Sequence, residues 1–218
     1  MDDLIHATRA RIAELGRLMY ERYLTDASGG NISARVGDLI CITPRYAGSK
    51  YQWRLRPEQV IVADLNGQKL AGEGEISRES KVHFRLLREF PDGQAVVHGH
   101  PRHVMVFAMA GRPITPVLEN MLKFGVIQVC RFAPAHSDAL AENIADGLRG
   151  QEAVIRKQAA AVIVPWHGLF VLGKDLEAAF DAAERIEVNA QCILFSRLLP
   201  GEPVDPEAIH ARLREQKA

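Results

Sequence analysis

The chain has 218 residues, which is enough for one sizeable hydrophobic core. Its 27 lysines and arginines balance its 27 aspartates and glutamates, so no global field favours nucleic acid or an anionic membrane as a partner. No apolar run is long enough to span a membrane, and we expect a soluble, cytoplasmic protein with one domain over residues 1–200 and a C-terminal tail over residues 201–218.

Periodicity and turn signals predict a chain in which helices and strands mix throughout. The predicted elements, in chain order, are a helix from residue 2 or 3 to about residue 24, hairpin strands at 31–36 and 38–44, strands at 59–65 and 68–72, a helix at 78–90, a strand at 94–100, a helix starting at Pro101, a helix at 138–149, strands on either side of a bend at 165–168, and a final helix at 174–199. Asp2 or Asp3 is the expected cap of the first helix and Ser77 that of the second. The order of elements predicts an α/β fold with a mostly antiparallel or mixed sheet.

The cysteines give no sign of a special site. Cys41, Cys130 and Cys192 are odd in number, lie far apart and form no CxxC pair. A disulfide framework or a thiolate metal site would need paired cysteines, so we expect buried, unreactive thiols.

Two histidines stand one residue apart at the end of a predicted strand, in the segment VVHGHP. Because successive side chains of a strand point to opposite faces, His98 and His100 project the same way, which suits two ligands of one metal ion. The alternative is a pair of satisfied polar residues at a strand end. A catalytic zinc site normally takes three protein ligands, so a third is needed.

His167 is the best candidate for the third ligand, because it follows a buried apolar strand in the segment VIVPWHG. His103 competes from the next helix, where we favour a supporting or purely structural role. The remaining histidines are expected to be solvated or packed in the core: His6, His83, His136 and His210. Glu79 opens a predicted helix, where backbone donors favour a negative charge, and is the candidate catalytic carboxylate; a surface glutamate is the default reading.

The ordered motifs ASGGNISAR, ITP, SRE, VVHGHP and VPWHG resemble the class II aldolase/adducin family over roughly residues 3 to 198. The resemblance implies a three-layer α/β/α fold around a mainly antiparallel sheet, usually assembled as a homotetramer with sites at subunit boundaries. It implies one divalent metal per subunit, Zn²⁺ or alternatively Mn²⁺, on His98, His100 and His167. It also implies Glu79 as acid/base and Gly30 with Asn31 as the turn that cradles a phosphate.

The chain departs from the family pattern around the expected anion pocket. The family's TPSG segment begins at Thr43 but continues with Arg45 and Lys50, and the SSE motif reads Ser77, Arg78, Glu79. These residues are candidates for binding an anionic small molecule, a phosphate or a carboxylate, since guanidinium groups suit both. Where the fuculose-phosphate enzyme has a proton-donating tyrosine, our alignment places Asn120, which is no general acid.

Three functions fit these residues. The first is a retro-aldol cleavage of a ketose phosphate or hydroxy-keto acid through an enediolate, in which Glu79 shuttles a proton. The second is a metal-dependent decarboxylation of a hydroxylated aromatic or keto acid, which needs no proton for the departing carbon dioxide. The third is a non-catalytic scaffold that resembles the adducin head domain, which lacks the histidine trio. We place the aldolase first.

Overall fold

The computed structural model describes residues 1–201 and 203–216 and contains one eight-stranded sheet. The strands are β1 (Asn31–Val36), β2 (Leu39–Ile42), β3 (Ile61–Asp64), β4 (Lys69–Ala71), β5 (Ala95–Gly99), β6 (Gln128–Val129), β7 (Ala159–Val164) and β8 (Gly168–Gly173). Their order in the sheet is β4-β3-β2-β1-β5-β8-β7-β6. Each neighbouring pair is antiparallel except β6 with β7, so the expectation of a mainly antiparallel sheet is confirmed, with one parallel pair.

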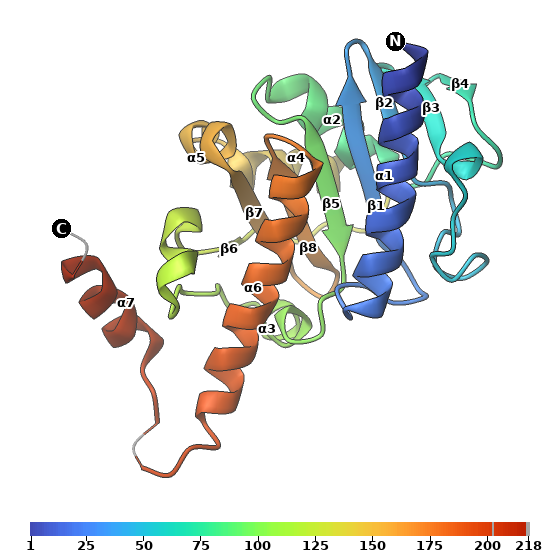
Figure 1. Cartoon of the computed structure of the whole chain (residues 1–218). Helices are drawn as coiled ribbons and strands as arrows, with labels where there is room; N and C mark the ends of the chain where they lie inside the picture. Colours follow the sequence, from blue (N-terminus) through green and yellow to red (C-terminus); the bar gives the residue numbers. More distant parts are fainter. Residues whose placement is uncertain (202, 217–218) are drawn as a thin grey trace.

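Helices cover both faces of this sheet (Figure 1). The α-helices are α1 (Asp2–Glu21), α2 (Ser80–Glu89), α3 (Val104–Ala110), α4 (Asp138–Leu148), α5 (Glu152–Lys157), α6 (Leu176–Ser196) and α7 (Pro206–Glu215), and the 3-10 helices are η1 (Pro57–Gln59) and η2 (Glu119–Phe124). In Figure 1, α1 and α6 lie in front of the sheet, while α2 and α4 lie behind it. No helix in the described parts of the chain is long and apolar enough to cross a membrane.

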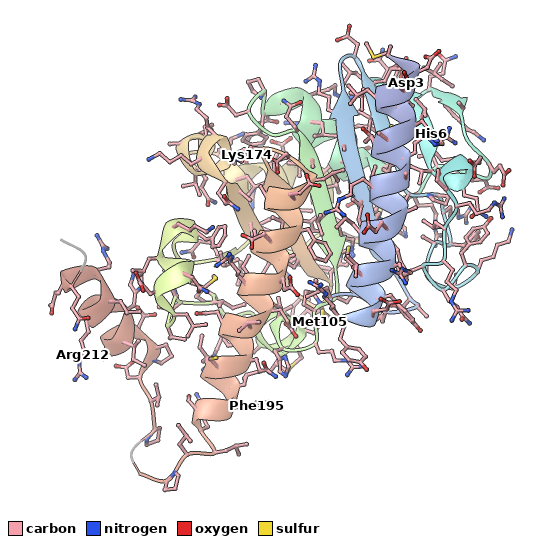
Figure 2. All side chains as sticks on the ribbon, viewed as in Figure 1. Asp3, His6, Met105, Lys174, Phe195 and Arg212 are labelled. Carbon is pink, nitrogen blue, oxygen red and sulfur yellow. The ribbon has the colours of Figure 1, made fainter. Side chains whose placement is uncertain are left out.

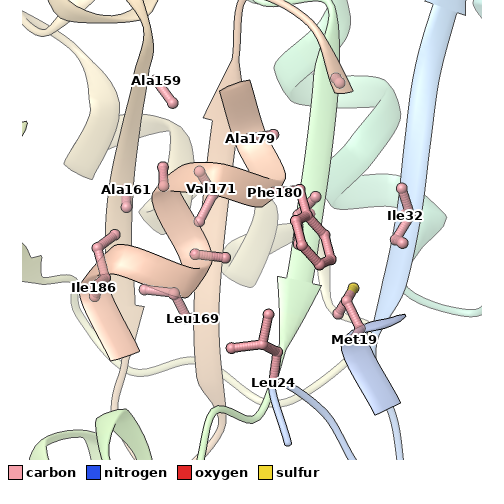
Figure 3. Packing of buried hydrophobic residues seen from close by; sticks show 14 of the residues in the cluster. Met19, Leu24, Ile32, Ala159, Ala161, Leu169, Val171, Ala179, Phe180 and Ile186 are labelled. Atoms are coloured by element: carbon pink, nitrogen blue, oxygen red, sulfur yellow. The ribbon is translucent and has the colours of Figure 1, made fainter. Parts of the chain in front are cut away.

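The central strands are buried on both faces, which explains their nearly continuous apolar sequences. Along β5, Val97 packs in the cluster under α1 and α6, whereas its neighbour Val96 packs in the cluster under α2 and α4. Figure 3 shows part of the first cluster, in which Phe180 of α6 lies near Met19 of α1. Two separate cores on either side of one sheet make the three-layer arrangement.

Two helix starts differ from the predictions. The N-cap of α1 is Met1, and Asp2 and Asp3 lie in the first turn without a side-chain cap. The N-cap of α2 is Glu79 rather than Ser77. The Ser77 hydroxyl accepts the Glu79 N–H at 3.3 Å and the Asn31 amide at 3.1 Å, so it fixes the turn that precedes the helix.

The expected tail also contains a helix, α7, which stands away from the sheet in Figure 1. Asp205 caps it by accepting the Glu207 N–H, and Pro206 occupies the first helical position, where the missing N–H costs nothing. The helix is tied to the loop between α3 and η2 by a hydrogen bond from Thr115 Oγ1 to Glu207 (2.6 Å). Asp-Pro-Glu is a helix-start signal that the sequence reading overlooked. The division at residue 200 remains a prediction.

Candidate active site

The sheet brings three histidines together at one end of its central strands. His98 lies on β5, His100 directly follows that strand, and His167 lies in the turn between β7 and β8. Because β5 and β8 are antiparallel with Gly99 opposite Leu169, the end of β5 lies beside the start of β8. The three side chains each offer a ring nitrogen, and these atoms lie within 4.8 Å of one another. That separation is small enough for one metal ion to bind all three.

The hydrogen bonds of His98 leave one nitrogen free for a ligand. Its Nδ1 lies 2.9 Å from the carbonyl oxygen of Leu169, which can only accept, so we assign the ring proton to Nδ1. Nε2 therefore carries a lone pair, and it is buried without a hydrogen-bond partner in the part of the chain that the structure describes. Phe170 stacks on the ring at 3.9 Å between centroids and fixes its orientation. A buried, bare imidazole nitrogen among two others fits a divalent metal ion.

His100 is held from the loop before β1. Its Nδ1 lies 3.4 Å from Asp26 Oδ1 and 3.5 Å from the Ser28 hydroxyl. Burial lowers the pKa of His100 to about 4, with a further contribution from His98. The ring is therefore neutral near pH 7 and keeps a lone pair for a metal. Sequence reasoning missed Asp26, because nothing in the local pattern links it to a residue so far along the chain.

The Glu79 carboxylate lies among these imidazoles. Its Oε1 is 2.9 Å from His167 Nε2, and its Oε2 is 3.1 Å from His98 Nε2. Burial by itself would raise the pKa of Glu79, but the close contacts with His98 and His167 outweigh that effect and lower the pKa below the ordinary range. The carboxylate is therefore ionised, and it is only 7% exposed.

A buried polar chain supports Glu79 from below. His83 is fully buried and lies between two polar side chains. Its Nδ1 is 2.7 Å from the Ser33 hydroxyl, and its Nε2 contacts the side-chain amide oxygen of Asn31. Burial lowers the pKa of His83 to about 3, so this ring is neutral. With its oxygen engaged, Asn31 turns its amide nitrogen toward Ser77 (3.1 Å) and Glu79 (3.4 Å). The expected core role of His83 is therefore confirmed, and it also orients Asn31.

A cavity of about 440 Å³ opens beside the histidines. Eight of the residues singled out from the sequence line it: Gly30, Asn31, Arg45, Ser77, Arg78, Glu79, His100 and His167. His98 is buried behind them. Arg45 pairs with Glu75 at 2.6 Å, whereas Arg78 is exposed and makes no hydrogen bond or ion pair with any described residue. Arg78 is thus available to an anion.

The structure does not bring three of the candidate substrate-binding residues to this cavity. Thr43 is buried at the end of β2, where its hydroxyl accepts the Ile32 N–H at 3.1 Å. Lys50 is exposed and lies 5.1 Å from the ring centre of Tyr51. Asn120 is exposed on η2. Alignment by motif order could not detect that η2 packs against α6 rather than against the cavity.

His103 and His136 lie in different surroundings, the first bonded to Glu187 and the second at the cavity. His103 Nδ1 lies 2.7 Å from Glu187, which also accepts the His103 and Val104 N–H groups, so the expected structural role is confirmed. His136, expected to be solvated or packed in the core, is 38% exposed and lines the cavity, with its Nδ1 3.9 Å from Glu79 Oε1. No sequence signal marks this approach, because the loop that carries it is fixed by tertiary contacts. Figure 2 shows Met105, another lining residue, at the lower end of the sheet where β5 ends.

We expect Gly168→Ala to weaken metal binding. A Cβ at this position would lie 2.5 Å from the Gly99 carbonyl oxygen and 2.8 Å from His100 Cδ2, so backbone and ring must move apart. Overpacking of this kind costs about 1–3 kcal/mol. Thermal unfolding and metal titration check the effect. Gly150→Ala strains a backbone with φ of 84° but meets no described atom within 4 Å, so it is the control for destabilising the chain at a glycine outside the cavity lining. Unchanged metal affinity would contradict the close packing.

The sequence matches the model of one protein family, described as Class II Aldolase and Adducin N-terminal domain, over residues 10–194. It is 32% identical to an L-fuculose phosphate aldolase of Methanococcus maripaludis over 178 residues, which cover 80% of this chain and 89% of that protein. It is 30% identical to a 3-oxo-tetronate 4-phosphate decarboxylase of Haemophilus influenzae over 201 residues, which cover 88% of each. A solved structure of an L-fuculose 1-phosphate aldolase has a TM-score of 0.79 at 24% identity and covers 97% of both chains, which shows the same fold.

Proposed function

The chain belongs to the family of the class II aldolase and adducin N-terminal domain, and from this premise we propose a divalent-metal-dependent lyase that cleaves a ketose phosphate or hydroxy-keto acid by a retro-aldol reaction. It is an enzyme of the lyase type, as its relatives are. The observation that carries the proposal is the convergence of three imidazoles beside an ionised glutamate at an open cavity. A scaffold that resembles adducin would have no use for this trio.

His98, His100 and His167 are the proposed ligands of one metal ion per subunit, Zn²⁺ or alternatively Mn²⁺, since imidazole suits both. Such an ion would supply Lewis acidity, drawing electron density from a substrate carbonyl oxygen as the bond breaks. Glu79, ionised at rest, accepts a proton during the reaction and delivers it to the carbon left with the electron pair. Asn31 and Ser77 orient Glu79 through their hydrogen bonds, and Gly30 lets the backbone approach the substrate.

Arg78 is the proposed anchor of the substrate's anionic group, with Arg45 nearby. We expect Arg78→Ser to raise KM by about 10- to 100-fold with little change in kcat, because a charge-assisted hydrogen bond is worth about 1.5–3 kcal/mol in both bound and transition states. Steady-state kinetics on the best substrate check this. Arg56→Ser, which removes an exposed arginine paired with Glu73, is the control. A fall in kcat alone would assign Arg78 another role.

A decarboxylase is the second candidate, favoured by the similarity to the Haemophilus influenzae enzyme and by an arginine that suits a carboxylate. The deciding experiment incubates the metal-loaded protein with L-fuculose 1-phosphate, other ketose 1-phosphates, 3-oxo-tetronate 4-phosphate and hydroxylated aromatic acids, and measures aldehyde and carbon dioxide separately. Aldehyde supports the aldolase. Carbon dioxide without aldehyde would replace it by the decarboxylase. Neither product, together with a protein that binds no metal, would favour the scaffold.

A homotetramer and a cytoplasmic location complete the proposal. Large apolar side chains near the cavity are exposed in the single chain, among them Trp166 (67%), Met109 (61%) and Phe132 (53%), which supports burial against another copy. The free cysteines Cys41, Cys130 and Cys192 are consistent with a reducing compartment. Light scattering during gel filtration tests the tetramer through the molar mass.

A further inference from the structure

His136 occupies an unusual position in the loop between β6 and α4. Its backbone has φ of 69°, in the left-handed region that residues other than glycine seldom adopt. The turn around it is fixed, because Ser137 donates both its N–H (3.2 Å) and its hydroxyl (2.7 Å) to the Pro134 carbonyl oxygen and then caps α4. The conformation is therefore imposed by the surrounding structure, which holds the imidazole over the cavity.

The two edges of this imidazole face different surroundings. Nδ1 is buried without a hydrogen-bond partner among the described residues and lies 3.9 Å from Glu79 Oε1, which is too long for a hydrogen bond. The side chain as a whole is 38% exposed, so the rest of the ring is open to the cavity. Burial lowers the pKa of His136, so the ring is neutral near pH 7 and can accept a proton. His136 thus connects the substrate space with the carboxylate.

Retro-aldol cleavage needs an acceptor for one particular proton. The hydroxyl on the carbon that becomes the aldehyde must lose its proton as its C–O bond becomes a carbonyl. Tyr46 also lines the cavity, but its ring lies against the Arg45 guanidinium, 4.6 Å from the ring centre, and its hydroxyl is tested below. Asp26 is engaged by Ser28 and His100. Within the cavity lining, this leaves His136 and Glu79, and Glu79 already serves the carbon.

Resting on the proposed retro-aldol function, we propose that His136 is the catalytic group that accepts the proton of the substrate hydroxyl during cleavage and passes it toward Glu79. The hydroxyl O–H bond breaks and its proton binds Nε2. The C–O bond becomes a carbonyl, and the carbon–carbon bond breaks with its electron pair left beside the ketone. The Nδ1 proton moves to Glu79 Oε1, and Glu79 delivers a proton to that carbon. The ring is left with its proton on Nε2, and proton exchange with water restores the proton on Nδ1 before the next turnover, so no further reactant is consumed.

The distance between His136 and Glu79 is consistent with this order of events. In the structure Oε1 lies 2.9 Å from His167 Nε2, within reach of a proton on that nitrogen. A ring nitrogen that ligates a metal has no proton to donate, so a metal-bound His167 leaves Oε1 without that donor. His136 Nδ1, 3.9 Å from Oε1, can then take its place as donor. A movement of about 1 Å toward Oε1 would bring it within hydrogen-bond distance. Catalytic hydrogen bonds commonly tighten in this way when substrate binds.

The experiment compares two reactions of the same site: the full cleavage, and the exchange of a carbon-bound hydrogen of the ketone product with solvent, which does not involve the aldehyde. Retro-aldol cleavage of L-fuculose 1-phosphate breaks the bond between the carbon beside the ketone and the next carbon, and releases dihydroxyacetone phosphate. The hydrogen on the carbon beside the ketone of this product can exchange with heavy water through Glu79 alone. The variant is His136→Gly, because glycine adopts the left-handed backbone without strain. We expect cleavage to fall by about 100-fold or more and exchange to stay within about threefold of the wild type. Glu79→Gln should lose both.

Added imidazole gives a readout that a structural role would not move. Because the ring of His136 lies at an open cavity, free imidazole can occupy its place, and we expect it to restore cleavage to His136→Gly without affecting exchange. His6→Ala is the matched control, since His6 is exposed on α1 at the opposite end of the sheet from Met105 (Figure 2). Ring-nitrogen NMR of the wild type should show the His136 proton on Nδ1.

Each contrary result has a definite meaning. Full cleavage by His136→Gly overturns the proposal while the retro-aldol function stands. Loss of cleavage and exchange together, with no rescue by imidazole, also overturns it, because His136 would then be structural. Loss of cleavage in Tyr46→Phe with cleavage kept in His136→Gly would assign the proton to Tyr46. A wild-type protein that neither cleaves nor exchanges overturns the proposed function and this proposal with it.

Discussion

Replacing His167 by alanine should remove the metal ion and the activity together. Two imidazoles remain, His98 and His100, and two ligands hold a divalent cation poorly. Changing even an outer partner of a metal ligand commonly costs 10- to 100-fold in affinity, so loss of a ligand itself should cost roughly a thousandfold or more. Elemental analysis of the dialysed protein checks this, with near one equivalent of metal expected for the wild type and almost none for the variant.

The fold should survive that change. The side chain of His167 is 15% exposed and lies in a turn, and its ring meets those of His98 and Phe170 edge-on, at 4.9 and 5.9 Å between centroids, rather than stacking on them. Thermal unfolding of the metal-free wild type and the metal-free variant should therefore differ little. His103→Ala is a suitable control, because it removes an imidazole bonded to Glu187 and away from the trio. A His167→Ala protein that keeps a full equivalent of metal would show that the three rings do not share one ion.

Most of the fold could be predicted because its signals are local. The β1–β2 hairpin turns at Gly37, whose φ is 60°, and the Asn66-Gly67 turn joins β3 to β4, as the dipeptides predict. Helix starts were less certain, because a serine hydroxyl can serve a turn as well as a cap. At Ser77 the choice was made by Asn31, which arrives from another strand.

The site was predictable where its residues follow strands and unpredictable where loops meet. His98, His100 and His167 stand at the ends of buried strands, and a sheet brings such ends together. Asp26 and His136 reach the cavity through loops that have no periodic pattern. The resemblance supplied Glu79, whose helix start is its only local signal. Asn120 shows the opposite case, in which a motif-based alignment assigns a residue that the fold directs to η2.

Glu79→Gln should keep the metal ion and lose turnover. Glutamine has nearly the same shape and still offers an oxygen to its neighbours, so the three imidazoles remain in place around it. It cannot hold a transferable proton near pH 7, and loss of a general acid–base group costs about 100- to 10,000-fold in kcat. Metal content and kcat, measured on the same preparation, check both halves of the expectation. Glu73→Gln, which removes an exposed carboxylate paired with Arg56, is the control.

The two halves of that result separate three roles for the carboxylate. Metal retained with turnover lost assigns Glu79 to proton transfer. Metal lost with turnover lost would make it a fourth ligand, because the neutral amide binds a cation more weakly than a carboxylate. Turnover retained would remove it from the reaction, and the lowered pKa of Glu79 would then reflect only its contacts with His98 and His167. The Glu79 carboxylate contacts two of the three proposed metal ligands, His98 and His167, and lies 3.9 Å from His136. This one substitution therefore tests the proposed metal site and the proposed proton transfer together.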